Sequence, residues 1–79
     1  MSTKHHHLAE ELPEYKDAIH ELKVSDNHFA KLFDAYHECV KQILRIEDEI
    51  EAASDFFLED LKKRRLDMKD QMVGMLSRV

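Results

Sequence analysis

The sequence predicts an all-α protein, and three observations support this fold class. The 79 residues include one Gly and one Pro, too few for the tight turns that connect the strands of a sheet. Most of the other residues are Ala, Leu, Glu, Lys, Gln, Arg and Met, the strongest helix formers. Through the middle of the chain apolar residues return every seven residues, which is the repeat of packed helices.

The length and composition predict one small soluble domain, residues 1–79. A chain of this size buries only about 60% of its unfolded surface, so a disulfide, a metal or a partner chain usually adds stability. Cys39 is the only cysteine, which excludes an intrachain disulfide and fits a reducing compartment. The N-terminal residues lack an apolar leader and no run is long enough to span a membrane, so we expect a cytoplasmic protein without membrane contact.

The first segment, residues 1–11, is polar, and we expect it to be flexible. It contains three consecutive histidines, His5 to His7, which could be part of a tag, native sequence or a weak metal binder. A first helix is predicted over residues 13–23, because Pro13 suits the first helical turn. Its apolar residues recur at spacings of three and four and form one stripe. They are Leu12, Tyr15, Ile19 and Leu22.

A second, longer helix is predicted over residues 26–53. Ser25 or Asp26 can cap its start. With Phe29 as position a of a heptad, every a and d position through four heptads is apolar, which predicts a helix-packing seam. Phe33 and Val40 widen this seam at the e positions.

His28, His37 and Cys39 lie within twelve positions of one another, and this raises the question of a metal or catalytic site. On a helix His28 and His37 fall on opposite sides of the cylinder, and His37 and Cys39 also diverge. No metal-ligand spacing is present. We therefore expect Cys39 in the core and His37 on a solvated face beside Asp34 and Lys41.

A break is expected at residues 52–57, followed by a third helix over residues 55–77, which Ser54 or Asp55 can cap. The apolar residues of the third helix do not fall on the a and d positions continued from the second helix. They are displaced by one residue. A short connection between antiparallel helices resets this phase, whereas a straight continuous helix would turn its seam away. Arg65 falls within the new apolar row, where its stem can cover apolar surface or its guanidinium can pair with an acid such as Glu47.

Two charged runs are candidates for functional sites. The basic cluster Lys62, Lys63, Arg64 and Arg65 could contact a phosphate backbone, but four successive helical residues spread around the helix and acidic residues surround them. The acidic run at residues 47–51 lacks the bent loop that binds calcium. No nucleophile, phosphate loop or converging acid pair is apparent, so we expect neither an enzyme nor a cofactor or metal site.

Three stretches resemble the YdcH-like family of small, uncharacterised bacterial proteins. They are "HHHLAEELPEYKDAIHELK" at 5–23, "DNHFAKLFDAYHECVKQILRIE" at 26–47 and "LEDLKKRRLDMKDQMVGML" at 58–76. The resemblance implies a helical protein whose histidine run is partly native, and it implies no assigned activity. The chain departs from the family at Cys39 and Val40, where Leu and Asp are usual. It also lacks the Gly or Pro often found before the equivalent of Ser54.

We therefore expect an antiparallel, coiled-coil-like hairpin of the two long helices with a short N-terminal helix, assembling into a helical bundle. A homo-oligomer, with a dimer favoured, would cover the remaining apolar face, and an unidentified protein partner is an alternative. The expected function is a non-enzymatic interaction or structural module; a nucleic-acid-associated factor using residues 62–65 is the alternative. The expected core and oligomer seam comprises Phe29, Leu32, Phe33, Tyr36, Cys39, Val40, Ile43, Ile46, Ile50, Leu58, Leu61, Met68, Met72 and Met75.

Overall fold

The computed structural model describes residues 8–78, and the histidine run at residues 5–7 lies outside them. The predicted all-α class is confirmed: within residues 8–78 the regular elements are all helical. They are α1 (Leu8–Glu11), the 3₁₀ turn η1 (Pro13–Tyr15), α2 (Lys16–Ser25), α3 (Asn27–Glu47) and α4 (Asp55–Leu76).

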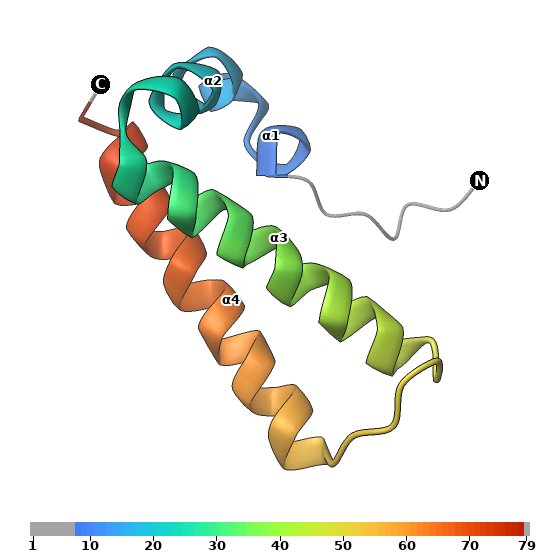
Figure 1. Cartoon of the computed structure of the whole chain (residues 1–79). Coiled ribbons are helices and arrows are strands. Elements are labelled where there is room, and N and C mark those ends of the chain that lie inside the picture. The colour runs from blue at the N-terminus through green and yellow to red at the C-terminus, as the bar shows by residue number, and fades with distance from the viewer. Residues whose placement is uncertain (1–7, 79) are drawn as a thin grey trace.

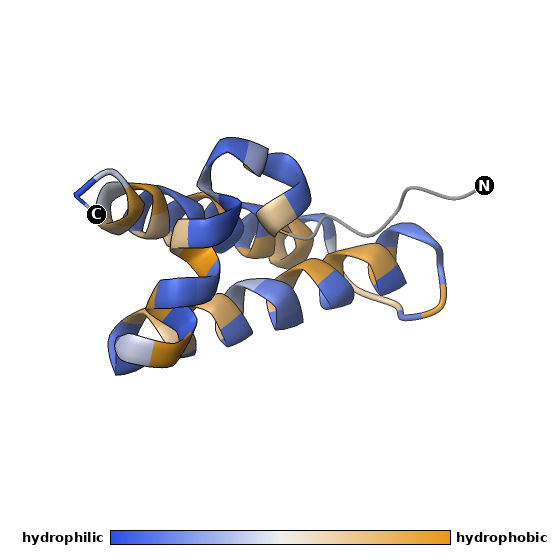
Figure 2. Ribbon diagram, turned by 90° about the horizontal axis from the view of Figure 1, so that it is seen from above, coloured by the Kyte–Doolittle hydropathy of each residue, from blue (hydrophilic) through white to orange (hydrophobic). Residues whose placement is uncertain are grey.

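The long helices α3 and α4 lie side by side and run in opposite directions (Figure 1). The short helix α2 lies across the end of the pair where α3 begins and α4 ends (Figure 1). Helix α1, which precedes α2 in the chain, lies beside α3. Apolar and polar residues alternate along both long helices, as amphipathic packing requires (Figure 2).

The core consists of two neighbouring clusters between these helices. The larger one lies where α1 and α2 meet the long pair, and it includes Leu8, Ile19, Phe29, Phe33, Tyr36, Val40, Met72 and Leu76. The smaller one lies further along α3 and α4 and consists of Cys39, Ile43 and Leu61. Partly buried Met68 packs against both clusters, so the apolar interior is continuous.

Side-chain caps start both long helices where capping residues were expected. The Asp26 carboxylate accepts a hydrogen bond from the backbone N–H of Phe29 at 3.0 Å. The Ser54 hydroxyl accepts one from the N–H of Phe57 at 3.1 Å. Each bond satisfies one of the free N–H groups of a first helical turn, which is worth about 1 kcal/mol.

The second helix ends at Glu47, six residues before the expected end at residue 53. Glu49 adopts a positive φ of 63°, and the N–H groups of Ile50 and Glu49 donate to the carbonyls of Arg45 and Ile46. This is the Schellman arrangement that closes helices, with Glu in the place usually taken by Gly. Because the chain leaves the helix there, Ile50 lies outside the core and is 73% exposed, which corrects its expected seam position.

Residues 8–11 form a helical turn, where we expected a flexible segment. They form α1, and the Leu8 side chain is completely buried. The helix expected over residues 13–23 begins with the 3₁₀ turn at Pro13 and continues as α2 to Ser25, where the Asp26 N–H still donates to Leu22. The expected stripe of Leu12, Tyr15, Ile19 and Leu22 packs on the larger cluster.

Candidate functional site

The residues expected in the seam lie mostly between the helices. Eight of the fourteen are buried: Phe29, Phe33, Tyr36, Cys39, Val40, Ile43, Leu61 and Met72. Five others are partly buried: Leu32, Ile46, Leu58, Met68 and Met75. The fold covers this seam with α1, α2 and α4 of the same chain, so the surface that we expected a second chain to complete is largely filled from within.

Sequence reasoning missed Leu8 and Leu76 as core residues. Leu8 lies four residues before Leu12, and Leu76 lies four residues after Met72. Both therefore extend apolar stripes that the sequence already shows, and this i,i+4 spacing could have identified them.

Cys39 is held as a structural residue between α3 and α4. Its thiol donates to the backbone carbonyl of Leu61 at 3.1 Å, and the side chain is buried. Burial raises the pKa of the Cys39 thiol, which opposes formation of the thiolate. Since the thiolate is the reactive form, this environment disfavours nucleophilic chemistry.

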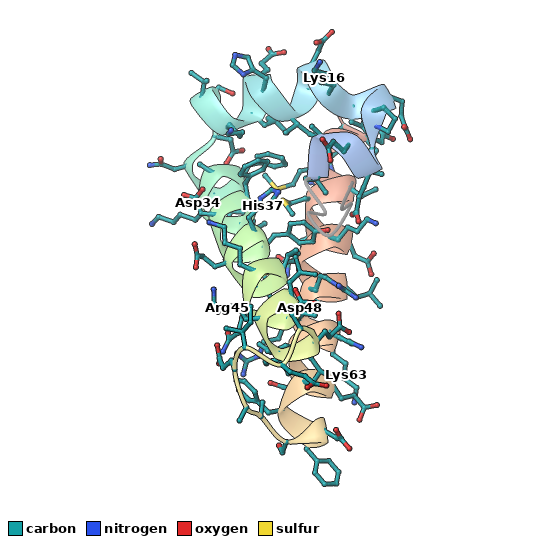
Figure 3. All side chains as sticks on the ribbon, turned by 90° about the vertical axis from the view of Figure 1, so that its right-hand side faces the viewer. Lys16, Asp34, His37, Arg45, Asp48 and Lys63 are labelled. Atoms are coloured by element: carbon teal, nitrogen blue, oxygen red, sulfur yellow. The ribbon has the colours of Figure 1, made fainter. Side chains whose placement is uncertain are left out.

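His37 does not lie on a solvated face, which corrects the expectation from the heptad. Figure 3 shows it on the side of α3 toward α1 and α4, with Asp34 on the other side. Its ring lies 4.3 Å from that of Phe33 and meets the Tyr36 ring edge-on. Nδ1 lies 2.9 Å from the Phe33 carbonyl, and Nε2 accepts from the Leu8 N–H at 3.1 Å. The Phe33 carbonyl can only accept and Nε2 accepts from the Leu8 N–H, so the two contacts together fit a neutral ring with its proton on Nδ1.

A polar network at Tyr36, the residue before His37, joins α1, α3 and α4. The Tyr36 hydroxyl donates to the Glu11 carboxylate at 2.8 Å, and the Lys69 ammonium lies 3.2 Å from the same oxygen. Burial, followed by the hydrogen bond to Glu11, raises the pKa of the Tyr36 phenol. The network fixes α1 on both long helices, so its role is structural.

The four residues of the basic cluster separate in space. Lys62 pairs with Glu47 at 3.0 Å, and Arg64 pairs with Asp60 at 3.0 Å. Arg65 lines an open groove of about 510 Å³ with Lys62, Lys69, Glu11 and Glu47. Lys63 lies on the side of α4 away from α3 (Figure 3). Glu47, the acid that we considered as a partner for Arg65 across an interface, pairs with Lys62 of the same chain. The four cations do not form one phosphate-binding strip.

Large apolar side chains are exposed at the end of the helix pair where α3 turns into α4. Phe56 is 86% exposed, and Ile50 and Phe57 are also solvent-exposed. We call these three residues the apolar tip. The acidic residues Asp48, Glu49 and Asp55 belong to the same segment, so the tip combines apolar surface with negative charge.

A second surface runs along the outer side of α4. Its members, Phe56, Glu59, Lys63, Leu66 and Asp70, are all exposed and follow one another at spacings of three, four, three and four. This spacing places them on one stripe, and Lys63 lies about 200° around the helix from buried Leu61. The fold therefore leaves one side of α4 with a mixed apolar and charged surface, which we call the outer stripe.

Among residues 8–78 no group of three or more His, Cys, Asp or Glu side chains is placed to hold a metal ion. Within the same range no helix is both apolar enough and long enough to cross a membrane.

Comparison with known proteins identifies relatives over most of the chain. The family model described as "Protein of unknown function (DUF465)" matches residues 29–76, which span most of α3 and α4. The uncharacterised protein YdcH of Escherichia coli (strain K12) is 33% identical over 64 residues, 81% of this chain and 86% of the relative. YdcH of Shigella flexneri matches to the same extent. No solved structure shows a match. The resemblance to YdcH-like proteins is confirmed.

Proposed function

This chain belongs to the DUF465 family of proteins of unknown function, and we propose that it is a non-enzymatic helical module that acts by binding other proteins. Two of the residues that the sequence raised as candidates for catalysis, Cys39 and His37, support this proposal. Cys39 is buried against a carbonyl, and both ring nitrogens of His37 hold backbone groups. Such side chains are engaged in folding and have little freedom to act on a substrate.

The observation that carries the proposal is the apolar tip. Fully burying a Phe side chain is worth about 1.5–3 kcal/mol, and the tip leaves Phe56 and Ile50 largely in water. A soluble chain of this size rarely exposes several large apolar side chains at one end unless another surface covers them. The core is closed by α1 and α2 without these residues, so the fold itself does not require them.

The charge around the tip indicates what kind of partner would fit. Asp48, Glu49 and Asp55 would repel an acidic surface and would attract a basic one. The partner surface that matches is therefore an apolar pocket with Lys or Arg side chains at its rim. Mixed hot spots of this kind, apolar at the centre and charged outside, are common in transient interfaces.

A crosslinked pull-down from the native cell tests this proposal. The double variant Ile50→Ser with Phe57→Ser removes two of the three tip side chains without touching the core, and it should capture much less of a partner that the wild-type chain captures. Val24→Ser is the matched control, because Val24 is 79% exposed on α2, at the other end of the pair. A partner that is lost equally with both variants, or with neither, would contradict binding through the tip.

The alternative function, nucleic-acid association through residues 62–65, has less support. Two of the four cations are paired with acids and the groove at Arg65 is flanked by Glu11 and Glu47, which would repel phosphates. We expect no binding to DNA or RNA at physiological salt. Tight binding that weakens steeply with added salt would favour the alternative.

The presence of a single cysteine, Cys39, fits the expected cytoplasmic location, since disulfides are rare in reducing compartments. Fractionation of cells with an antibody against the chain would test it. Recovery in an oxidising compartment would contradict this location.

A further inference from the structure

We propose that two copies of this chain associate through the outer stripe of α4, with the two α4 helices antiparallel. This inference rests on the proposed function and names one of the partners, a second copy. It uses Glu59, Lys63 and Leu66, which lie outside the apolar tip; only Phe56 belongs to both surfaces. The surface is available because all five stripe residues are exposed.

The charged side chains at the centre of the stripe, Glu59 and Lys63, have no partner within the described residues. The spacing of Glu59 and Lys63 allows an i,i+4 ion pair, yet among the described residues neither side chain has a hydrogen bond or an ion pair. The neighbouring pair Asp60 and Arg64, with the same spacing, does form at 3.0 Å. Phe56 and Leu66 are 86% and 60% exposed. The stripe therefore presents two large apolar groups and two opposite charges without intrachain partners.

The stripe is complementary to itself. Glu59 and Lys63 lie two residues on either side of position 61, and Phe56 and Leu66 lie five residues on either side of the same position. A twofold axis level with position 61 therefore brings Phe56 onto the partner's Leu66 and Glu59 onto the partner's Lys63. By symmetry each contact forms twice, as in any isologous dimer.

The charges of the stripe disfavour the parallel arrangement of the same two helices. Parallel pairing in register would bring Lys63 onto Lys63 and Glu59 onto Glu59, and like charges across an interface oppose association. The geometry of the side chains also permits the antiparallel contact, because spacings of three and four are those that seat one helix against another. Of the two in-register arrangements, the antiparallel one alone satisfies both charges.

The contact is short, and this sets the expected affinity. From Phe56 to Leu66 the helix rises about 15 Å, and such a contact buries less than the roughly 800 Å² per partner of a standard interface. We expect a dimer that dissociates at about 10–100 µM. A homodimer was expected for a domain of this size. The outer stripe would form it through a face of α4, whereas the expectation placed it at the seam of α3.

Charge reversal tests the proposal through sedimentation of the full chain from about 10 µM to 1 mM. Wild-type chains should dimerise across this range. Lys63→Glu makes both charged positions of the stripe acidic, and Glu59→Lys makes both basic. Each should weaken self-association at least tenfold, because each places two like-charged pairs at the interface.

Mixing the two variants gives the decisive result. In an equimolar mixture an acidic stripe meets a basic one, and association should return to the wild-type level or above it. The double variant, which exchanges the two charges within one chain, should also dimerise. A change in monomer structure could not produce rescue on mixing, so circular dichroism of each variant serves only to confirm folding.

Three outcomes would overturn the proposal: a wild-type chain that stays monomeric to 1 mM, single variants that dimerise normally, or a mixture that associates no better than its components. The tip is tested separately. Ile50→Ser with Phe57→Ser should strongly reduce partner capture and leave sedimentation unchanged, whereas Leu66→Ser should reduce dimerisation at least tenfold and leave partner capture unchanged.

Discussion

At the scale of single residues, His37 provides the least expected contact of the fold. Its Nε2 accepts from the N–H of Leu8, which lies 29 residues away and opens α1. The first N–H groups of a helix lack partners within the helix, so this ring satisfies a donor that would otherwise be buried beside Leu8. His37→Phe keeps the aromatic contacts and removes the acceptor.

We expect His37→Phe to destabilise the chain by about 1–3 kcal/mol, the cost of leaving a buried donor unsatisfied. Urea unfolding measures this loss, and hydrogen exchange of the Leu8 amide reports on α1 directly. His20→Phe is the control, because His20 is exposed on α2. Equal stability of the two variants would mean that the His37 bond contributes nothing.

Tyr36 gives a prediction about alkaline pH. Burial and the Glu11 carboxylate raise the pKa of Tyr36 above its ordinary value of 10.0, so the folded chain keeps a phenol proton that the unfolded chain releases above pH 10. Stability due to Tyr36 is therefore complete below pH 10 and is lost as the pH rises beyond it. Urea unfolding at pH 8 and pH 10.5 should show a smaller loss for Tyr36→Phe than for Tyr15→Phe. An equal loss would contradict the role of Tyr36.

Glu49 is the residue at which a substitution should improve the protein. Its φ of 63° lies in the left-handed region, which costs an L-residue about 1–2 kcal/mol and costs Gly almost nothing. Glu49→Gly should therefore raise the free energy of unfolding by about 0.5–1 kcal/mol, after the greater flexibility of Gly in the unfolded chain is counted. Urea unfolding beside Glu49→Ala checks this, since Ala gains no such relief. Destabilisation by Gly would show that the turn adopts another conformation.

At the scale of whole elements, Ile43 tests the packing of α3 on α4. The side chain is 1% exposed and packs with Cys39 and Leu61. A carboxylate there would be buried without a partner, at a cost comparable with the whole stability of a small domain. Ile43→Asp should therefore lose most helical circular dichroism at 25 °C, and Val24→Asp, at an exposed site, should retain it. A folded Ile43→Asp would mean that α3 faces α4 with another side.

The elements also show how far the sequence predicts this fold. The seam of α3 is visible in the heptads because each turn repeats the same signal, and Asp26 and Ser54 mark the helix starts by their chemistry. The end of α3 was missed because the Schellman turn uses Glu49, and Glu carries no signal for a positive φ. α1 was missed because one turn has no periodicity, and its partner His37 is distant in sequence. The outer stripe gives no periodic apolar signal in the sequence, because it contains only two apolar residues and charged residues lie between them.

At the scale of the whole molecule, the small core and the outer stripe are linked. The chain measures 39 × 28 × 16 Å along its principal axes, and its shortest dimension is little more than the thickness of one helix with side chains. A body this thin has few fully buried residues. Binding of a second copy to α4 would therefore support a fold that is only marginally stable alone.

This link predicts a thermal midpoint that rises with protein concentration. At about ten times the dissociation constant, association adds about 1.4 kcal/mol to the folded state, and 1 kcal/mol shifts the midpoint of a domain of this size by about 4–8 °C. Differential scanning calorimetry from 10 µM to 1 mM should show a rise of at least about 5 °C for the wild-type chain. Lys63→Glu should show almost none, and its equimolar mixture with Glu59→Lys should recover the rise. A wild-type midpoint that does not change with concentration would show that self-association does not stabilise this fold.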